Sequence, residues 1–314
     1  MSDSTFRPVV GGIDLGGTKI EATLFDAELL AGPSRRIATP RDSYERLHAA
    51  LLEEIRWLRA TAKNPDLPVG IGLPGLIDPV AKVSVTANLP AGGRTLATDI
   101  QSAAGGRIAL VNDCKAFALS EANGGGGAGF DSVFGLILGT GLGGGFCRNG
   151  NLILGANGLT GEIGHYGLPA HLMAKLDLPI LQCGCGRMGC FETLVSGTGL
   201  SRLARHLAGR EASGEVIVAA SSDGDADMAR VLDVFVRLAA ELIHAIQLHL
   251  DPECIVLGGG LSRIEGLDRM FGHALGQALL PSVRPPEIRK PKFGDSSGGR
   301  GAALFALSQK EARS

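Results

Sequence analysis

The stretch GGIDLGGTKI, from Gly11 to Ile20, decides the fold because a glycine turn separates two strand-like segments. The spacing from Gly12 to Gly17 matches a P-loop, but a P-loop continues with Lys and then Ser or Thr. Here Thr18 precedes Lys19. The residue pattern on either side predicts two paired strands instead, VVGGIDL before the turn and KIEATLF after it.

A second hairpin of the same kind follows in SVFGLILGTGLGGGFCRNGNLI. A shift of 123 positions places Leu15–Thr18 on Leu138–Gly141. The same shift places Asp26 on Asn149, where the second strand of each pair would turn. We therefore expect an internal duplication with two similar α/β halves, each opening with a glycine-turned hairpin.

Length and composition narrow the class of protein. The chain has 314 residues, enough for two domains. Its 47 glycines are about twice the number expected from the usual share of ~7%. They cluster along the sequence, which indicates tight turns and places where the backbone comes close to another group. A net charge of −2 offers no electrostatic footprint for nucleic acid or an anionic membrane. Without a signal pattern or an apolar run of about 18 residues, we expect a cytoplasmic protein.

Other segments follow helix or strand patterns. We expect helices over residues 41–61, 115–122, 227–250 and 298–307, and buried strands over 68–73, 107–113 and 253–258. The glycine-rich segment from Asn123 to Phe130 is a plausible domain boundary. The final helix is expected to return to the first domain.

The glycine turns suggest a grip on phosphate. Backbone N–H groups at such turns form anion nests without needing a lysine. Two facing turns would clamp a polyphosphate, and Gly258–Gly260 would approach the base or ribose of a nucleotide. Asp14 would hold Mg²⁺ through water. The alternative is that each turn is an ordinary hairpin.

DLGGTK, LGTGLGGG and VLGGG resemble the phosphate and adenosine motifs of the sugar-kinase, actin and heat-shock-protein superfamily. The resemblance implies a duplicated ribonuclease-H-like α/β fold, the two-domain ATPase fold of actin and hexokinase, with Mg²⁺ and ATP. The implied domains are residues 1–121 with 296–314, and residues 122–295. The implied nucleotide-binding residues are Asp14, Gly16, Gly17, Thr18, Lys19, Gly139, Thr140, Gly141, Gly143, Gly258, Gly259 and Gly260.

The segment LQCGCGRMGCFET carries Cys183, Cys185 and Cys190, separated by glycines that let three sulfurs converge. Three thiolates and one imidazole make a closed tetrahedral Zn²⁺ site. His165 and His171 are the nearest upstream histidines, and a set of buried thiols is the alternative. The remaining cysteines, Cys114, Cys147 and Cys254, lie in apolar segments and are expected in the core.

CGCGRMGCFE, preceded by GEIGH, resembles the signature of the ROK family of bacterial repressors, open-reading-frame proteins and sugar kinases. The resemblance implies that His165 and the three cysteines hold a structural zinc. It also places His165, Glu162 and Glu192 against sugar hydroxyls and implies a homodimer. His165 lies 18 residues before Cys183, a longer gap than in many members, so His171 stays the alternative ligand.

VNDCKAF places Asp113 where a strand ends and a helix begins. A positioned carboxylate there can take the proton of a sugar hydroxyl that attacks the γ-phosphate. The alternative is that Asp113 only caps the helix. The Asn-Asp pair of the family implies that Asp113 is the general base and Asn112 a sugar partner.

Within this family, TPRDSY, ANLPA and TGEIGH resemble the amino-sugar kinases, which implies transfer to the 6-hydroxyl of N-acetyl-D-glucosamine. Fructokinase and glucokinase are the alternatives; they usually carry a Trp in the segment equivalent to ANLPA, where this chain has none. Besides Asp113, the expected substrate-binding residues are Gly75, Asn88, Asn112, Glu162, His165 and Glu192.

Two other classes compete with a kinase. A ROK repressor carries a DNA-binding domain before the phosphate motif, and here only thirteen residues precede Asp14. A sugar sensor without catalysis would have lost the Asp base or the phosphate turns, and this sequence keeps both. Both observations favour the kinase.

Overall fold

The structure is a computed structural model that describes residues 6–78, 80–86 and 88–311. The chain forms two compact units. The first comprises the chain up to Glu121, residues 154–159 and the chain from Phe293 onward; the second comprises Ala122–Ile153 and Thr160–Lys292. Residues 154–159 and 293–295 therefore lie in the first unit, although we expected them in the second domain. The functional domain division stays a prediction.

The first unit is built on a five-stranded sheet of order β3-β2-β1-β4-β7. Its strands are β1 (Val10–Leu15), β2 (Lys19–Phe25), β3 (Ala31–Ala38), β4 (Val69–Leu73) and β7 (Ile108–Asn112). The expected hairpin is confirmed, since β1 and β2 pair antiparallel. β4 runs parallel to both β1 and β7, so these three strands end at the same edge of the sheet.

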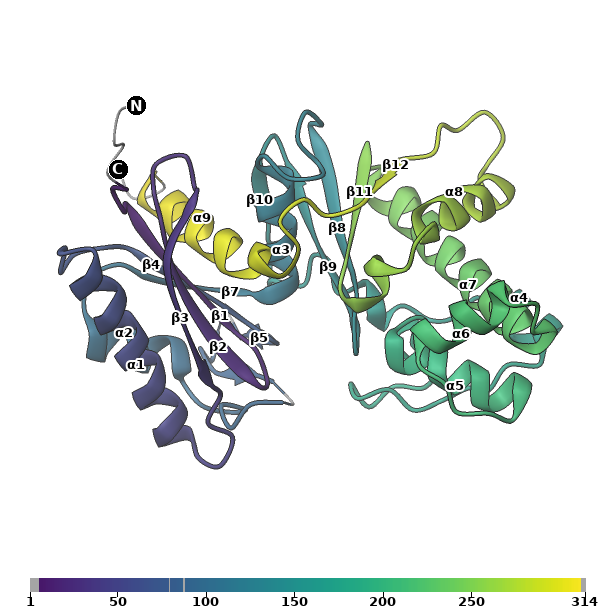
Figure 1. Ribbon diagram of the computed structural model, residues 1–314, viewed down its shortest axis with the longest axis horizontal. Helices are drawn as coiled ribbons and strands as arrows, with labels where there is room; N and C mark the ends of the chain where they lie inside the picture. Colours follow the sequence, from purple (N-terminus) through teal and green to yellow (C-terminus); the bar gives the residue numbers. More distant parts are fainter. Residues whose placement is uncertain (1–5, 79, 87, 312–314) are drawn as a thin grey trace. The chain divides into compact units, whose positions relative to one another are not determined.

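Helices cover both faces of this sheet (Figure 1). The helices of the unit are α1 (Tyr44–Thr61), α2 (Leu96–Ala104), α3 (Asp113–Ala122) and α9 (Ser297–Glu311), with a small hairpin β5 (Leu76–Ile77) and β6 (Ser84–Val85) and a 3₁₀ turn η4 (Gly294–Ser296). Ser43 caps α1 by accepting the N–H of Arg46, as expected. The expected stripe Leu47, Leu51, Ile55 and Leu58 is buried, and each such side chain contributes about 1.5–3 kcal/mol.

The last helix lies directly on the backbone of the sheet. A Cβ atom added to Gly70 on β4 would lie 1.8 Å from the carbonyl oxygen of Ala302 on α9. A Cβ added to Gly12 on β1 would lie 2.0 Å from the oxygen of Gly299. Only glycine permits this approach. The expected return of the final helix to the first unit is confirmed, because α9 packs on β1, β4 and β7.

The second unit repeats the plan. Its sheet has the order β10-β9-β8-β11-β12, with β8 (Ser132–Leu138), β9 (Leu142–Arg148), β10 (Asn151–Ile153), β11 (Cys254–Gly258) and β12 (Glu287–Arg289). Its helices are α4 (Ala170–Leu176), α5 (Gly197–Ala208), α6 (Gly214–Ser222), α7 (Ala226–Leu250) and α8 (Leu267–Ala278). The 3₁₀ turns are η1 (Ile163–His165), η2 (Phe191–Thr193) and η3 (Gly260–Arg263). The long helix α7, capped by Asp225, forms the centre of its core.

The expected duplication is confirmed by the identical strand order of the two sheets. The turn of the first hairpin, between Leu15 and Lys19, corresponds to that between Leu138 and Leu142, 123 positions later. The two turns differ in register, because Leu15 pairs with Ile20 whereas Leu138 pairs with Leu142. The second turn therefore closes one residue earlier than the first.

Across the part of the chain that the structure describes, we find no helix that is both long and apolar enough to span a bilayer.

Replacement of Gly70 by Ala should lower the free energy of unfolding by about 1–3 kcal/mol, because the new methyl group would overlap the backbone of α9. Gly72→Ala is the matched control on the same strand, where the nearest atom would lie 3.6 Å away. We expect it to stay within about 0.5 kcal/mol of the wild type. Urea unfolding measures both. Equal stability of the two variants would show that the contact of α9 with β4 is not tight.

Candidate functional site

The first glycine turn is fixed from inside and from outside. Within it, the N–H of Gly16 donates to the carbonyl of Lys19 at 2.9 Å. From outside, Thr39 makes two hydrogen bonds to the turn. Its hydroxyl donates to the carbonyl of Gly16 at 2.7 Å, and its backbone N–H donates to the carbonyl of Thr18 at 3.0 Å. Thr39 was not among the expected site residues, although it lies in the TPRDSY segment. The Nζ of Lys19 lies 3.5 Å from Glu21, within its own strand.

Asp14 lies in an acidic pocket of about 100 Å³, lined also by Glu21 and Asp295. Burial, and next the charge of Asp113, raises the pKa of Asp14 to about 6. The backbone of α9 approaches it closely, since a Cβ on Gly298 would lie 2.8 Å from its Oδ1. This concentration of negative charge favours a cation at Asp14.

Asp113 is the first residue of α3 and directly follows β7. Its Oδ1 accepts the N–H of Cys114 at 2.8 Å and the Nδ2 of Asn112 at 3.1 Å. Asn112 in turn caps the helix, because its Oδ1 accepts the N–H of Lys115 at 3.1 Å. The helix begins at Asp113, at the expected junction of strand and helix. The strand–helix junction thus fixes the orientation of the Asp113 carboxylate.

Asn112 also reaches the β5–β6 region, where its Nδ2 donates to the carbonyl of Gly75 at 2.9 Å. Gly75 has a φ of 116°, and a Cβ there would lie 2.2 Å from the oxygen of Val85. Gly75, Asn112 and Lys115 line a cavity of about 230 Å³ in the first unit. Lys115, only 2% exposed, was missed by the sequence analysis. Asn88 is exposed, and Ala87 of the ANLPA segment lies outside the described residues.

The second glycine turn, Gly139–Gly141, is also held from outside. The carbonyl of Gly139 accepts the N–H of Gly197 at 2.7 Å, and that of Thr140 accepts the hydroxyl of Thr198 at 2.9 Å. Gly197 and Thr198, the first residues of α5, were not expected in the site. Gly143 follows the turn on β9.

The third glycine segment lies beside this turn. Gly258 ends β11, and Gly260 begins η3. Gly259 has a φ of 79°, and a Cβ on it would lie 2.5 Å from the carbonyl of Leu138. Since Leu138 immediately precedes the turn, two of the three expected nucleotide-binding segments meet within the second unit.

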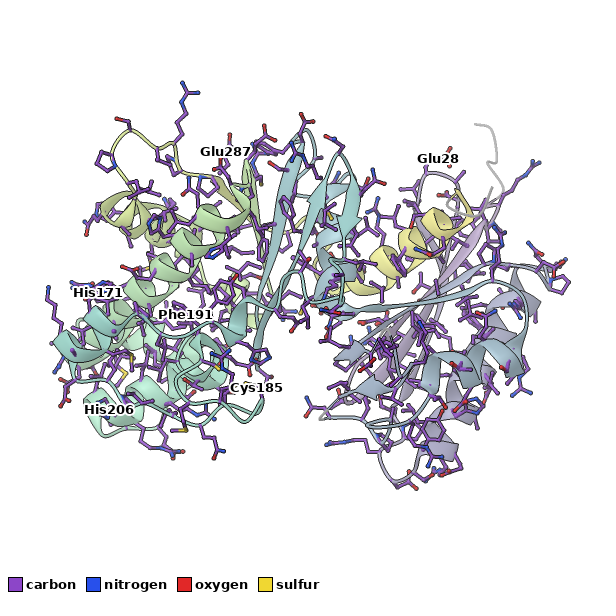
Figure 2. The ribbon with its side chains drawn as sticks, turned by 180° about the vertical axis from the view of Figure 1, so that it is seen from behind. Glu28, His171, Cys185, Phe191, His206 and Glu287 are labelled. Atoms are coloured by element: carbon purple, nitrogen blue, oxygen red, sulfur yellow. The ribbon has the colours of Figure 1, made fainter. Side chains whose placement is uncertain are left out.

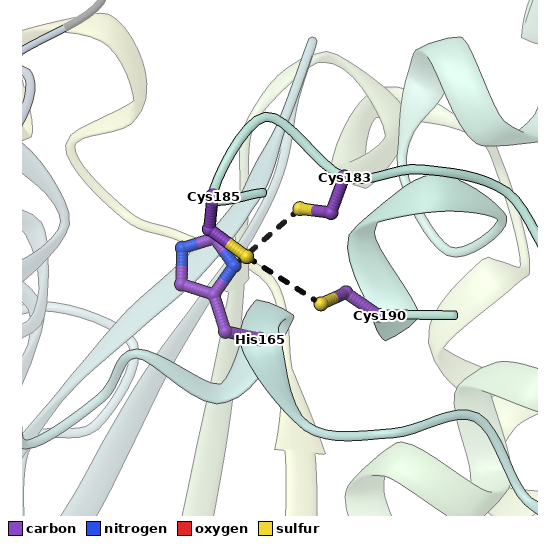
Figure 3. Close-up of side chains that lie close together, drawn as sticks. All are labelled: His165, Cys183, Cys185 and Cys190. Atoms are coloured by element: carbon purple, nitrogen blue, oxygen red, sulfur yellow. Dashed lines mark hydrogen bonds between the residues drawn. The ribbon is translucent and has the colours of Figure 1, made fainter. Parts of the chain in front are cut away.

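The cysteine segment forms a compact cluster with His165, and its four donor atoms lie within 4.8 Å of one another (Figure 3). Cys183 Sγ lies 3.6 Å from His165 Nδ1, and Cys185 Sγ lies 3.7 Å from Cys190 Sγ. A tetrahedral Zn²⁺ with Zn–S bonds of about 2.3 Å separates its sulfurs by about 3.8 Å. The two distances of 3.6 and 3.7 Å are therefore close to those of a zinc site.

The two candidate histidines are separated in the structure. His171 lies on α4, apart from Cys185 (Figure 2), and its Nε2 is 3.3 Å from Glu241. Its side chain is 64% exposed. His165 is the histidine that the structure places with the cysteines.

The cysteine thiols differ in acidity. Burial raises the pKa of Cys183, and it raises that of Cys190 to about 12. A hydrogen bond from the backbone of Arg187 lowers the pKa of Cys185. Because zinc binds thiolates, its binding would release protons from the buried thiols.

The GEIGH and CFE segments lie side by side. Gly167 forms an isolated bridge with Cys190, and the N–H of Phe191 donates to Tyr166 at 2.8 Å. This pairing brings η1, preceded by Glu162, against η2, which contains Glu192. The two expected sugar-binding glutamates therefore come from neighbouring turns of the second unit.

Comparison with known proteins agrees with these features. The chain is 40% identical over 295 residues to N-acetylgalactosamine kinase AgaK of Shewanella sp. strain ANA-3, covering 94% of this chain and 95% of that protein. It is 37% identical over 311 residues to N-acetyl-D-glucosamine kinase of Pasteurella multocida strain Pm70, covering 95% of this chain and 99% of that protein.

Solved structures share the fold. A ROK hexokinase from Thermus thermophilus matches with a TM-score of 0.86 and 30% identity, covering 96% of this chain and 99% of that one. A ROK family glucokinase from Streptomyces griseus, in complex with glucose and AMPPNP, matches with a TM-score of 0.76 and 26% identity, covering 95% and 99%. These matches confirm the expected duplicated hexokinase-type fold. The family model described as the ROK family matches residues 10–309, and the chain therefore belongs to the ROK family.

Proposed function

We propose that this protein transfers the γ-phosphoryl group of Mg·ATP to the 6-hydroxyl of N-acetyl-D-glucosamine. The position of Asp113 carries the proposal, because its carboxylate is oriented at the junction of β7 and α3. A sugar hydroxyl is a poor nucleophile at neutral pH, and a fixed carboxylate can accept its proton during attack. The names of the relatives at 37–40% identity support an N-acetylhexosamine as the acceptor.

In this reaction the sugar O6 forms a bond to the γ-phosphorus while the bond from that phosphorus to the bridging oxygen of ADP breaks. The O6 proton moves to the carboxylate of Asp113, and ADP leaves with the electron pair of the broken bond. Asn112 supports this step by donating to Asp113 Oδ1 and by capping α3. The N-terminus of that helix also favours the ionised carboxylate.

The glycine turns supply the proposed phosphate grip, since each holds its backbone in a fixed conformation through bonds from a distant threonine. Mg²⁺ would be held through water by Asp14. The raised pKa of Asp14 supports this assignment, because a divalent cation offsets the repulsion from Asp113, Glu21 and Asp295.

We also propose a structural zinc bound by His165, Cys183, Cys185 and Cys190. The distances between the donor atoms support it. When bound, the metal would fix the loop from Leu181 to Cys190 and orient the His165 ring toward the sugar. Self-association and a cytoplasmic location stay predictions.

A second candidate acceptor is N-acetyl-D-galactosamine. The relative that is 40% identical carries this sugar in its name, whereas the N-acetyl-D-glucosamine kinases lie at 37–38%. The two sugars differ only in the direction of the 4-hydroxyl. Discrimination between them therefore depends on the hydrogen-bond partner of that single hydroxyl.

Asp14→Asn should stabilise the nucleotide-free protein above pH 6. An unfolded Asp titrates near 3.8, so the folded wild type, with its pKa at about 6, loses stability as the pH rises from about 4 to 6. The loss is about 1–3 kcal/mol, and the variant lacks it. Urea unfolding at several pH values without Mg²⁺ measures the difference. Glu28→Gln, an exposed carboxylate, is the control. Parallel pH profiles for wild type and Asp14→Asn would contradict the buried charge.

Asp113→Asn should lower kcat by about 10²–10⁴-fold, because the amide cannot accept the proton. The amide oxygen can still accept the N–H of Cys114, so the local structure should persist. Steady-state kinetics measures the first effect and calorimetric sugar binding the second. A loss of sugar binding as large as the loss of turnover would mean that Asp113 mainly shapes the pocket.

ADP release with Mg·ATP should be fastest with N-acetyl-D-glucosamine in a panel that includes N-acetylgalactosamine, N-acetylmannosamine, glucose and fructose. We expect kcat/KM for N-acetyl-D-glucosamine to exceed that for N-acetylgalactosamine at least about tenfold, because one well-made hydrogen bond to the 4-hydroxyl corresponds to a ratio of about that size. Preference for N-acetylgalactosamine would show that the proposed acceptor is wrong, whereas the proposed kinase activity would stand. Absence of turnover on every sugar, with binding retained, would support a sensor.

A further inference from the structure

One short segment of the second unit connects the cysteine cluster to the second glycine turn. It begins at Cys190, a member of the cluster, continues through η2 and ends at Thr198 in α5. One end of the segment belongs to the cysteine cluster, and the other end contacts the second glycine turn. The segment therefore links the position of the cluster to that of the turn.

The segment is internally rigid. The N–H and the hydroxyl of Thr193 both donate to the carbonyl of Cys190, at 3.0 and 2.7 Å. The hydroxyl of Ser196 donates to the carbonyl of Glu192 at 2.9 Å and accepts the N–H of Gly199, which caps α5. Phe191, Leu194 and Val195 are buried in the core of the unit. Because each step is bonded and packed, displacement of Cys190 would displace the start of α5.

The carboxylate of Glu192 contacts both ends of this connection. Its Oε2 accepts the N–H of Leu142, the residue directly after the glycine turn, at 3.0 Å. Its Oε1 lies 3.7 Å from the Sγ of Cys183. A Cβ added to Gly141 would lie 2.7 Å from Oε2, so the carboxylate lies directly against the backbone of the turn.

The far end of the segment fixes the rest of the turn. Gly197 donates to Gly139, and a Cβ on Gly197 would lie 2.9 Å from the Gly139 carbonyl. Thr198 donates to Thr140. Together with Glu192, these bonds hold Gly139, Thr140 and Leu142 from a single segment.

We propose that the segment from Cys190 to Thr198 positions the second phosphate turn, with Glu192 as a positioning residue for nucleotide binding, so that the order of the Gly139–Leu142 turn depends on the state of the cysteine cluster. This inference deepens the proposed function and rests on it for the identity of the metal and the nucleotide. It assigns to the cluster a role toward the nucleotide, in addition to the sugar-side role of His165 and Glu192.

Hydrogen exchange tests the coupling without sugar or nucleotide. In the zinc-loaded protein the peptide containing Gly139–Leu142 should be protected, and removal of zinc with a chelator should raise its exchange rate about tenfold or more, because the charge-assisted bond to Leu142 loosens. Glu192→Ala should raise the same rate in the zinc-loaded protein. Glu192→Gln keeps an acceptor oxygen and should largely restore protection.

The first glycine turn, Gly16–Lys19, is the matched internal control, because its outside contacts come from Thr39 rather than from the cysteine segment. Its exchange rate should not change. Unchanged exchange at the second turn after zinc removal would overturn the proposal. An equal rise at both turns would also overturn it, since it would indicate general unfolding.

Kinetics provides a second readout. Thr198→Val removes only the hydroxyl that holds Thr140 and should raise the KM for Mg·ATP several-fold while kcat and the KM for sugar stay within about twofold. Thr198→Ser should restore the wild-type KM. Equal KM values for ATP in all three proteins would contradict the positioning role. If no sugar is phosphorylated, the kinase proposal fails while the exchange experiment still decides the coupling.

Discussion

The proposed phosphate grip depends on two hairpin turns whose backbone must stay fixed while offering N–H groups to a ligand. Hairpin pairing alone leaves a glycine turn free to change conformation, because glycine restricts φ and ψ so little. Bonds from outside remove that freedom. Thr39 holds the first turn from 23 residues away, and Thr198 holds the second from 58 residues away. The conformation of each turn is thus set by the tertiary fold, and the proposed phosphate binding would depend on contacts made far away in the sequence.

The first unit carries the electrostatic cost of the site. Asp14 lies on β1 and Asp113 directly after β7, with β4 between the two strands, and burial together with the charge of Asp113 raises the pKa of Asp14 to about 6. Buried carboxylates that repel each other destabilise the cation-free protein, so the proposed Mg²⁺ site would exchange stability for function at one place. The close packing of α9 on Gly12 and Gly70 keeps this arrangement rigid, since the same helix begins beside Asp14.

The sequence predicts what local patterns determine and misses what distant contacts determine. The hairpins, α1 and α7 follow from periodicity and caps, and Asp113 and the cysteines stand out by residue type and spacing. β3 was missed because it is an edge strand with alternating exposure and Pro33 in it, which reads as a loop. α2 was missed because it is short and Thr95 makes no side-chain cap bond. Thr39 and Thr198 bind the turns through tertiary hydrogen bonds, and Lys115 is buried beside the cavity of the first unit; no local pattern encodes these placements.

The duplication explains why the two halves share a plan and divide the chemistry. The shift of 123 positions that superimposes the turns places Asp14 on Ile137, so the second sheet has no carboxylate at the equivalent position. The second unit carries instead the cysteine cluster, in the connection between β10 and α7. The first unit therefore has a buried carboxylate beside its turn, whereas the second has the cysteine cluster near its own.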